Sequence, residues 1–179
     1  GKAEIPVRNA VAVEIGQGAG YIGVPPDPLG LALEKLGIDL PAVEKLDDAT
    51  LAEFGGLIIG AEAHFKDFAG LKQTPYALAD FILSGGGVAI LQLQDSDYET
   101  GYLPFDIQVH EDASSLGRIT LPDHPLFTRP NRVESLSGAV EYDRLTGAGA
   151  GWQVLAVDAG GAPAIIHAKA GKGEVVVVQ

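Results

Sequence analysis

The stretch TPYALADFILSGGGVAILQL, residues 74–93, decides the fold class because a helix, its stop and a strand follow one another directly in it. Thr74 and Pro75 are typical of a helix start. The apolar residues of the expected helix recur at helical spacing: Leu78, Phe81 and Ile82. The glycines at 85–87 end that helix, and the apolar run at 88–93 is typical of a buried strand. Residues 57–61 form another such run, so the order strand, helix, strand predicts a parallel sheet with crossover helices.

The N-terminal part shows the same alternation of strands and helices. Residues 10–15, AVAVEI, predict a first buried strand, and the glycine- and proline-rich residues 16–28 predict a loop. Asp27 is the expected N-cap of a helix that has Pro28 at its first position. Residues 38–43 then predict a second strand or extended segment.

The C-terminal part is rich in strands. Residues 152–158, 164–170 and 174–179 are apolar segments separated by the glycine-containing turns GGAP and GKG, which predicts an antiparallel meander. We therefore expect an α/β protein: a flavodoxin-like parallel sheet flanked by helices, with a strand-rich antiparallel C-terminal end. The chain shows no interdomain linker, so residues 1–179 are expected to form one domain, itself a fragment or domain of a larger protein.

The composition excludes several classes of function. There are 24 acidic residues against 12 basic ones, a formal charge of -12, which would repel nucleic acids and anionic membrane surfaces. No apolar run is long enough to span a membrane, so no membrane insertion is expected. The sequence contains no cysteine, which excludes disulfides, thiolate metal sites and a cysteine nucleophile.

The order of these segments resembles the class I glutamine amidotransferase-like superfamily. The resemblance is carried by LALEKLGIDL (31–40), LAEFGGLIIG (51–60), FILSGGGVAILQL (81–93), LPDHPLFTRPNRVESLSG (121–138) and residues 152–179. Within the superfamily the chain looks most like non-catalytic accessory domains. Examples are those attached to bacterial PIG-L-type deacetylase proteins and the trimerisation domains of some β-galactosidases.

The resemblance also shows what is missing. In the enzymes a cysteine stands at the sharp turn after the strand that corresponds to VAILQL, and here we expect that turn within Gln94–Tyr98. Glutamine hydrolysis by a thiolate is therefore excluded. The His-x-Glu pair of the enzymes has no counterpart, because His167 is followed by Ala-Lys-Ala and is expected to be an ordinary strand residue. His124 is expected to lie in a rigid turn that inserts Leu126 and Phe127 into the core.

Two groups of residues could bind a small ligand. Gly18 and Gly20 begin a Gly-x-Gly-x-x-Gly pattern, but the prolines that follow cannot form the phosphate-binding helix that this motif needs. A loop that lines a ligand site is the favoured interpretation. Asp95, Asp97 and Glu99 alternate after a buried strand, a spacing that could hold a divalent metal such as calcium or could simply be a solvated acidic loop.

His64 and Ser96 are the remaining candidates. His64 follows a strand and would face the same crevice as Asp95 and Asp97, at the carboxyl ends of the strands, where open α/β sheets bind ligands. Ser96 could replace the missing thiol as a nucleophile, or could be a ligand contact, but no Gly-x-Ser-x-Gly motif surrounds it.

The sequence therefore leaves three hypotheses. The favoured one is a non-catalytic structural or interaction domain that packs against a neighbouring domain or a second subunit; the resemblance adds that it is accessory to a carbohydrate-processing protein. The second is a sugar- or metal-binding module, and the third is a hydrolase with a histidine and carboxylate site. No further cofactor is expected, and the resemblance is compatible with a place outside the cytoplasm within a larger secreted protein.

Overall fold

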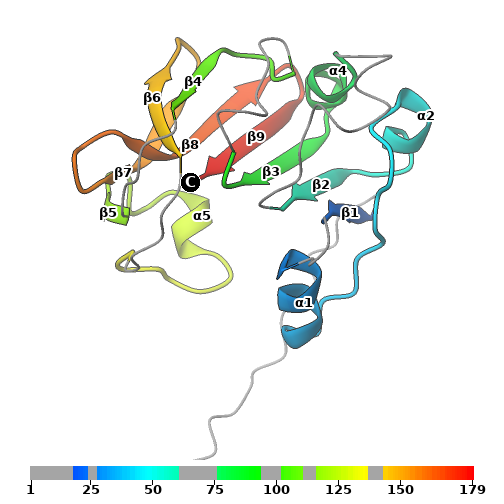
Figure 1. Cartoon of the computed structure of the whole chain (residues 1–179), viewed down its shortest axis with the longest axis horizontal. Coiled ribbons are helices and arrows are strands. Elements are labelled where there is room, and N and C mark those ends of the chain that lie inside the picture. Colours follow the sequence, from blue (N-terminus) through cyan, green and yellow to red (C-terminus); the bar gives the residue numbers. More distant parts are fainter. Residues whose placement is uncertain (1–17, 24–27, 61–75, 94–101, 111–115, 137–142) are drawn as a thin grey trace, which may run out of the picture.

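The computed structural model describes residues 18–23, 28–60, 76–93, 102–110, 116–136 and 143–179. A seven-stranded sheet in the order β1-β2-β3-β9-β8-β7-β5 forms the centre of the molecule (Figure 1). Four neighbouring strands are parallel: β1 (Ala19–Ile22), β2 (Gly56–Ile59), β3 (Gly87–Leu91) and β9 (Gly173–Val178). Three strands continue the sheet with antiparallel pairing: β8 (Pro163–Ala170), β7 (Gln153–Asp158) and β5 (Leu116–Ile119). The expected parallel sheet with an antiparallel C-terminal end is thereby confirmed.

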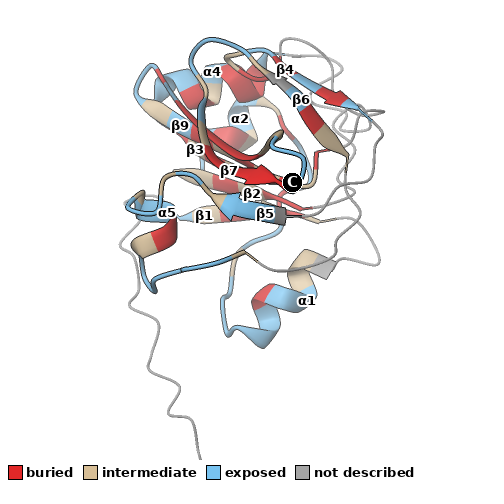
Figure 2. Ribbon diagram, turned by 90° about the vertical axis from the view of Figure 1, so that its left-hand side faces the viewer, coloured by how far each residue is buried: buried red, intermediate tan, exposed pale blue. Residues whose placement is uncertain are grey.

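Helices and a small strand pair lie on the two faces of this sheet. One face carries α2 (Asp48–Leu51), α4 (Ala77–Ser84) and the antiparallel pair of β4 (Ile107–His110) and β6 (Arg144–Ala148). The other face carries α1 (Pro28–Lys35) and α5 (Pro125–Thr128). Both views show this division, with α4 and β4 above the sheet and α1 and α5 below it (Figures 1 and 2).

The core is divided in the same way. The larger cluster lies between the sheet and α4, and includes Leu57, Ile90 and Val177 from the strands and Leu78 and Ile82 from the helix. Alternate residues of each parallel strand point into it, as the two-residue repeat of a strand requires. A smaller cluster on the opposite face is built from four buried residues: Phe127, Leu155, Ala156 and Ile165. The α5 segment thus has a core of its own.

Gly85 ends α4, as the sequence predicts, and Gly173 allows β9 to pack closely against the end of this helix. Gly85 has φ +130°, a conformation open to glycine, and it ends the helix. A Cβ at Gly173, in the first position of β9, would overlap the carbonyl oxygens of Ile82 and Gly86. The turn between β8 and β9 is further tied to α4 by the Lys172 N–H, which donates to the Leu83 carbonyl at 3.0 Å.

Several expected boundaries differ from the structure. Strand β1 falls inside the segment 16–28 for which the sequence predicts a loop, because its backbone pairs with β2 and, through a bridge at Ala42, with the predicted extended segment 38–43. The predicted strand 10–15 and Asp27 lie outside the described residues.

Near α5, one side-chain prediction is right and one is wrong. Phe127 is buried as expected. Leu126 is 38% exposed, because it lies on the outer side of a helix only four residues long.

Candidate functional site

The residues on which the sequence-based hypotheses depend most are outside the described part of the chain. These are His64, Asp95, Ser96, Asp97 and Glu99, whose ligand, metal or nucleophile roles stay predictions. Among the described residues, no three histidine, aspartate or glutamate side chains are grouped so that they could hold a metal ion.

The two glycines proposed to line a ligand site are in the described part. A phosphate-binding turn requires its Gly-x-Gly pattern after the end of a strand. Here Gly18 directly precedes β1 and Gly20 lies within it, so the pattern comes too early. Gly20 is buried, and a Cβ there would collide with Val43 and Phe54. Packing alone therefore accounts for the absence of a side chain at Gly20.

The carboxyl end of β3 carries the most distinctive backbone feature of the molecule. Gln92, directly after β3, has φ +53° and is the one residue other than glycine in the described part with a positive φ. Its N–H donates to the Val178 carbonyl at 2.6 Å, so the turn stays anchored to β9. A left-handed residue directly after a strand is one feature of a nucleophile elbow, the sharp turn that presents a catalytic side chain, and we refer to Gln92 and Leu93 as the elbow.

This elbow lies earlier than the sequence indicates. The strand ends at Leu91, whereas the apolar run predicts a strand to Leu93 and a sharp turn within Gln94–Tyr98. A signal is present, since Gln92 is the one polar residue inside the run 88–93. The side chain at the turn is therefore a glutamine amide, which is not a nucleophile.

The backbone N–H and carbonyl of Leu93, directly after Gln92, are both hydrogen-bonded by one buried side chain. The Leu93 N–H donates to Gln179 Oε1 at 2.7 Å, and Gln179 Nε2 donates to the Leu93 carbonyl at 2.9 Å. The same Nε2 donates to the Asp143 carbonyl at 2.6 Å, and Gln179 is only 4% exposed. Gln179 therefore joins the elbow after β3 to the segment before β6. No local pattern in the sequence indicates this contact, because the two residues are 86 positions apart.

This arrangement has a chemical consequence. In an elbow of this kind the N–H of the residue after the nucleophile helps to bind the oxyanion of the transition state. Here that N–H belongs to Leu93, and an internal amide oxygen already accepts its hydrogen bond. At this turn the side chain is thus an amide, and the N–H that follows it already has an internal acceptor.

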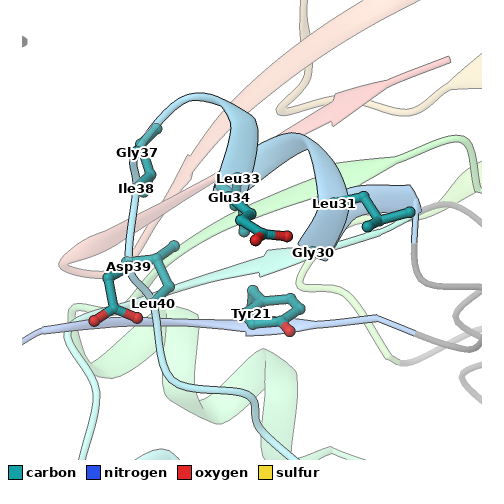
Figure 3. Close-up of a pocket in the computed structure, with 9 residues that line it drawn as sticks. All are labelled: Tyr21, Gly30, Leu31, Leu33, Glu34, Gly37, Ile38, Asp39 and Leu40. Carbon is teal, nitrogen blue, oxygen red and sulfur yellow. The ribbon is translucent and has the colours of Figure 1, made fainter.

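A hollow of about 610 Å³ lies between α1 and β1, away from the elbow (Figure 3). Tyr21 from β1 forms its floor, and Glu34 extends from α1 toward that ring. Its other residues come from α1 and the segment that follows: Gly30, Leu31, Leu33, Gly37, Ile38, Asp39 and Leu40. Leu31 is 54% exposed, and Leu36, which flanks the hollow, is 71% exposed. These two leucines leave apolar side chains exposed beside the hollow, whose lining also contains the carboxylates of Glu34 and Asp39.

Two histidines and a glutamate form a cluster on the α5 side of the sheet. His167 is a strand residue of β8, as predicted, and its Nε2 lies 3.1 Å from Glu174 Oε2 on β9. The ring of His124 meets the ring of His167 edge-on, with centroids 4.9 Å apart. Burial lowers the pKa of His124 below 6.5, and the positive charge of a protonated His167 lowers it further.

Comparison of the sequence with protein-family models and with curated proteins gives no match. Solved structures with the same fold do match. An exo-β-1,4-mannosidase from Opitutaceae bacterium strain TAV5 aligns over 90% of this chain with a TM-score of 0.56 and 14% identity. The chain spans only 31% of the length of that mannosidase.

Two further structures match over most of their own length. A GMP synthase-type protein from Thermoplasma acidophilum has a TM-score of 0.59 and 12% identity, with 91% of this chain and 83% of that chain covered. A glutamine amidotransferase has a TM-score of 0.55 and 15% identity, with 89% and 87% covered. At these identities the likeness concerns the fold, which is that of the glutamine amidotransferase-like α/β proteins.

No helix in the described part of the chain combines the length and the apolar character needed to cross a membrane.

Proposed function

We propose that this chain is a non-catalytic structural and interaction domain of amidotransferase-like fold, accessory to a carbohydrate-processing protein. The occupied elbow is the observation that carries this proposal. In this proposal Gln92 occupies the nucleophile position of the elbow, and Gln179 accepts the hydrogen bond of the Leu93 N–H that would otherwise bind an oxyanion. The absence of any cysteine from the sequence agrees with this interpretation.

The carbohydrate context is supported by the similarity to the mannosidase. There, a region like this chain accounts for 31% of a longer polypeptide. Leu31 of α1 and Leu36 directly after this helix offer a contact surface for a neighbour, because large apolar side chains gathered at one place on a surface are typical of interaction sites. We assign this surface, formed by Leu31, Leu36 and Ile38, to another domain of the same polypeptide.

Activity assays test the non-catalytic part of the proposal. The protein is expected to hydrolyse neither glutamine nor a panel of esters, amides and glycosides. Hydrolysis by the wild-type chain that is lost in His64→Ala would overturn the proposal and establish the hydrolase hypothesis. A Gln92→Cys variant is a useful comparison, because it places a thiol at the elbow while Gln179 still occupies the Leu93 N–H. We expect it to remain inactive.

The contact surface is tested by the double variant Leu31→Glu/Leu36→Glu. In the longer protein that contains this chain, it should expose the junction between the domains to limited proteolysis without unfolding either domain. Leu83→Glu is a matched control, because Leu83 is 44% exposed on α4, on the opposite face of the sheet. Equal protease sensitivity of both variants would contradict a specific role for the α1 surface.

A sugar-binding module is the second candidate, and the hollow beside α1 favours it. An aromatic ring with carboxylates nearby is a common arrangement for binding a polyol, since the ring packs on the sugar and the carboxylates accept hydrogen bonds from its hydroxyl groups. Thermal unfolding in the presence of mono- and oligosaccharides tests this candidate. A rise in Tm that Glu34→Gln abolishes and Glu53→Gln preserves would support it; an unchanged Tm would count against it.

A further inference from the structure

We propose that the segment 121–133, which contains α5, is a latch that is released from the sheet when His124 becomes protonated at mildly acidic pH. The latch lies in a different part of the molecule from the elbow. It is independent of whether the domain is catalytic.

The latch depends on a neutral His124. This residue is the N-cap of α5, and its Nδ1 accepts the Leu126 N–H at 3.3 Å. An imidazole nitrogen accepts a hydrogen bond only when it carries no proton, so the cap requires the tautomer with its proton on Nε2. Protonation at Nδ1 would place two donors face to face and remove the cap.

Two of the groups around His124, His167 and Lys169, disfavour a positive charge on its ring, whereas Glu174 favours one. His167 and Lys169 come from β8 and Glu174 comes from β9. Glu174 is 3.1 Å from His167 and so compensates a charge on that ring, but no such contact joins it to His124 in the described part of the chain. If both histidines are protonated, two like charges lie on rings whose centroids are 4.9 Å apart.

The α5 segment is short, and Phe127 is its one buried residue, with Leu121 packed beside the same cluster. The helix has four residues, and its backbone bonds include Phe127 N–H to the His124 carbonyl at 2.9 Å and Val133 N–H to the Phe127 carbonyl at 2.7 Å. Phe127, 2% exposed, anchors the segment in the small cluster with Leu155 and Ile165. Release would therefore uncover an apolar strip on the antiparallel part of the sheet.

The direction of the pH dependence follows from the lowered pKa of His124. The unfolded segment binds a proton near the ordinary pKa of about 6.5, whereas the folded segment resists it until lower pH. The stabilising effect of the cap is thus fully present above about pH 6.5 and is lost as the pH falls through the folded-state pKa.

Amide hydrogen exchange tests the latch. After correction for intrinsic rates, protection of the Phe127 and Val133 amides should fall by more than about two-fold between about pH 7.5 and about pH 5, while the amide of Ile90 in β3 keeps its protection. In His124→Asn the response should disappear, because asparagine caps a helix without titrating. His110→Asn, at an exposed position of β4, should retain the wild-type response.

Two results would overturn the latch. One is wild-type protection that changes by less than about two-fold over this range; the other is a His124→Asn protein that responds like the wild type. If His124→Asn loses protection throughout the sheet, His124→Asp takes its place with the same expectations, because it too is a good N-cap and does not titrate in this range.

Discussion

Replacing Gln179 by alanine should destabilise the domain far more than the loss of a glutamine usually does. The change removes three hydrogen bonds at once: one with the Leu93 N–H, one with the Leu93 carbonyl and one with the Asp143 carbonyl. It also leaves the Leu93 N–H inside the protein without its acceptor. A buried polar group left without a partner costs about 1–3 kcal/mol. With partial relief from water entering the space, the expected loss in the free energy of unfolding is about 2–4 kcal/mol.

Equilibrium denaturation with urea gives the measurement, and amide exchange at Leu93 locates the effect. Gln153→Ala is the matched control, because Gln153 is an exposed residue of β7 and its loss should change the free energy by less than about 0.5 kcal/mol. If Gln179→Ala is no more destabilising than Gln153→Ala, or if the Leu93 amide keeps its protection, the account of the occupied elbow is wrong.

A Gln179→Glu variant separates hydrogen bonding from packing, since the two side chains have nearly the same shape. The carboxylate could still accept from Leu93 but would face the Leu93 and Asp143 carbonyls without a proton to donate. Its pKa should therefore be raised above the ordinary value of about 4.3. The variant should approach wild-type stability below about pH 4.3 and lose stability as the pH rises through the raised pKa. A constant difference from the wild type across this range would refute the hydrogen-bond explanation.

Other positions give sharp expectations. Gly173→Ala should lower the free energy of unfolding in urea by about 2 kcal/mol, because its Cβ would overlap carbonyls at the end of α4. Gly87→Ala is the control: a Cβ there has open space, and the free energy of unfolding should change by less than about 0.5 kcal/mol. Asp158→Ala should lower the free energy of unfolding, measured by thermal unfolding, by about 3 kcal/mol, because this buried carboxylate is 2.9 Å from Arg144 Nε. If replacing an exposed aspartate by alanine lowers it equally, a structural role of Asp158 is contradicted. Gln92→Gly should be about 1 kcal/mol more stable than Gln92→Ala, because the backbone of residue 92 is left-handed and glycine adopts this conformation without strain. Glycine is usually the less stable of these two substitutions, so the opposite order would contradict a left-handed backbone here.

The parts of the fold that could be predicted from the sequence are those with strong local signals. The α4 helix, its glycine stop and β3 follow from one stretch in which apolar spacing changes from helical to continuous. The C-terminal strands follow in the same way, because β7, β8 and β9 are apolar runs separated by glycine turns. In these places local preference and tertiary pairing agree.

Other features depend on partners far away in the chain. Strand β1 has a glycine-rich sequence, and it is a strand because Gly20 fits beneath Val43 and Phe54 while the backbone pairs with β2. The role of Gln179 depends on a turn 86 residues earlier, and nothing near Gln179 in the sequence indicates it. Such contacts become visible only when the sheet order is known.

The occupied elbow also explains why a strained conformation persists where no reaction is expected. A left-handed residue other than glycine or asparagine usually costs about 1 kcal/mol or more, and catalytic elbows accept that cost in order to present a nucleophile. At Gln92 the same conformation brings the N–H and the carbonyl of Leu93 against the side chain of Gln179. The hydrogen bonds formed there offset the cost of the left-handed backbone. A catalytic elbow must leave that N–H open for its substrate, so a side chain that satisfies it increases stability and lowers reactivity. In the function proposed above, the contacts that stabilise this turn are therefore the same contacts that keep the Leu93 N–H from a substrate.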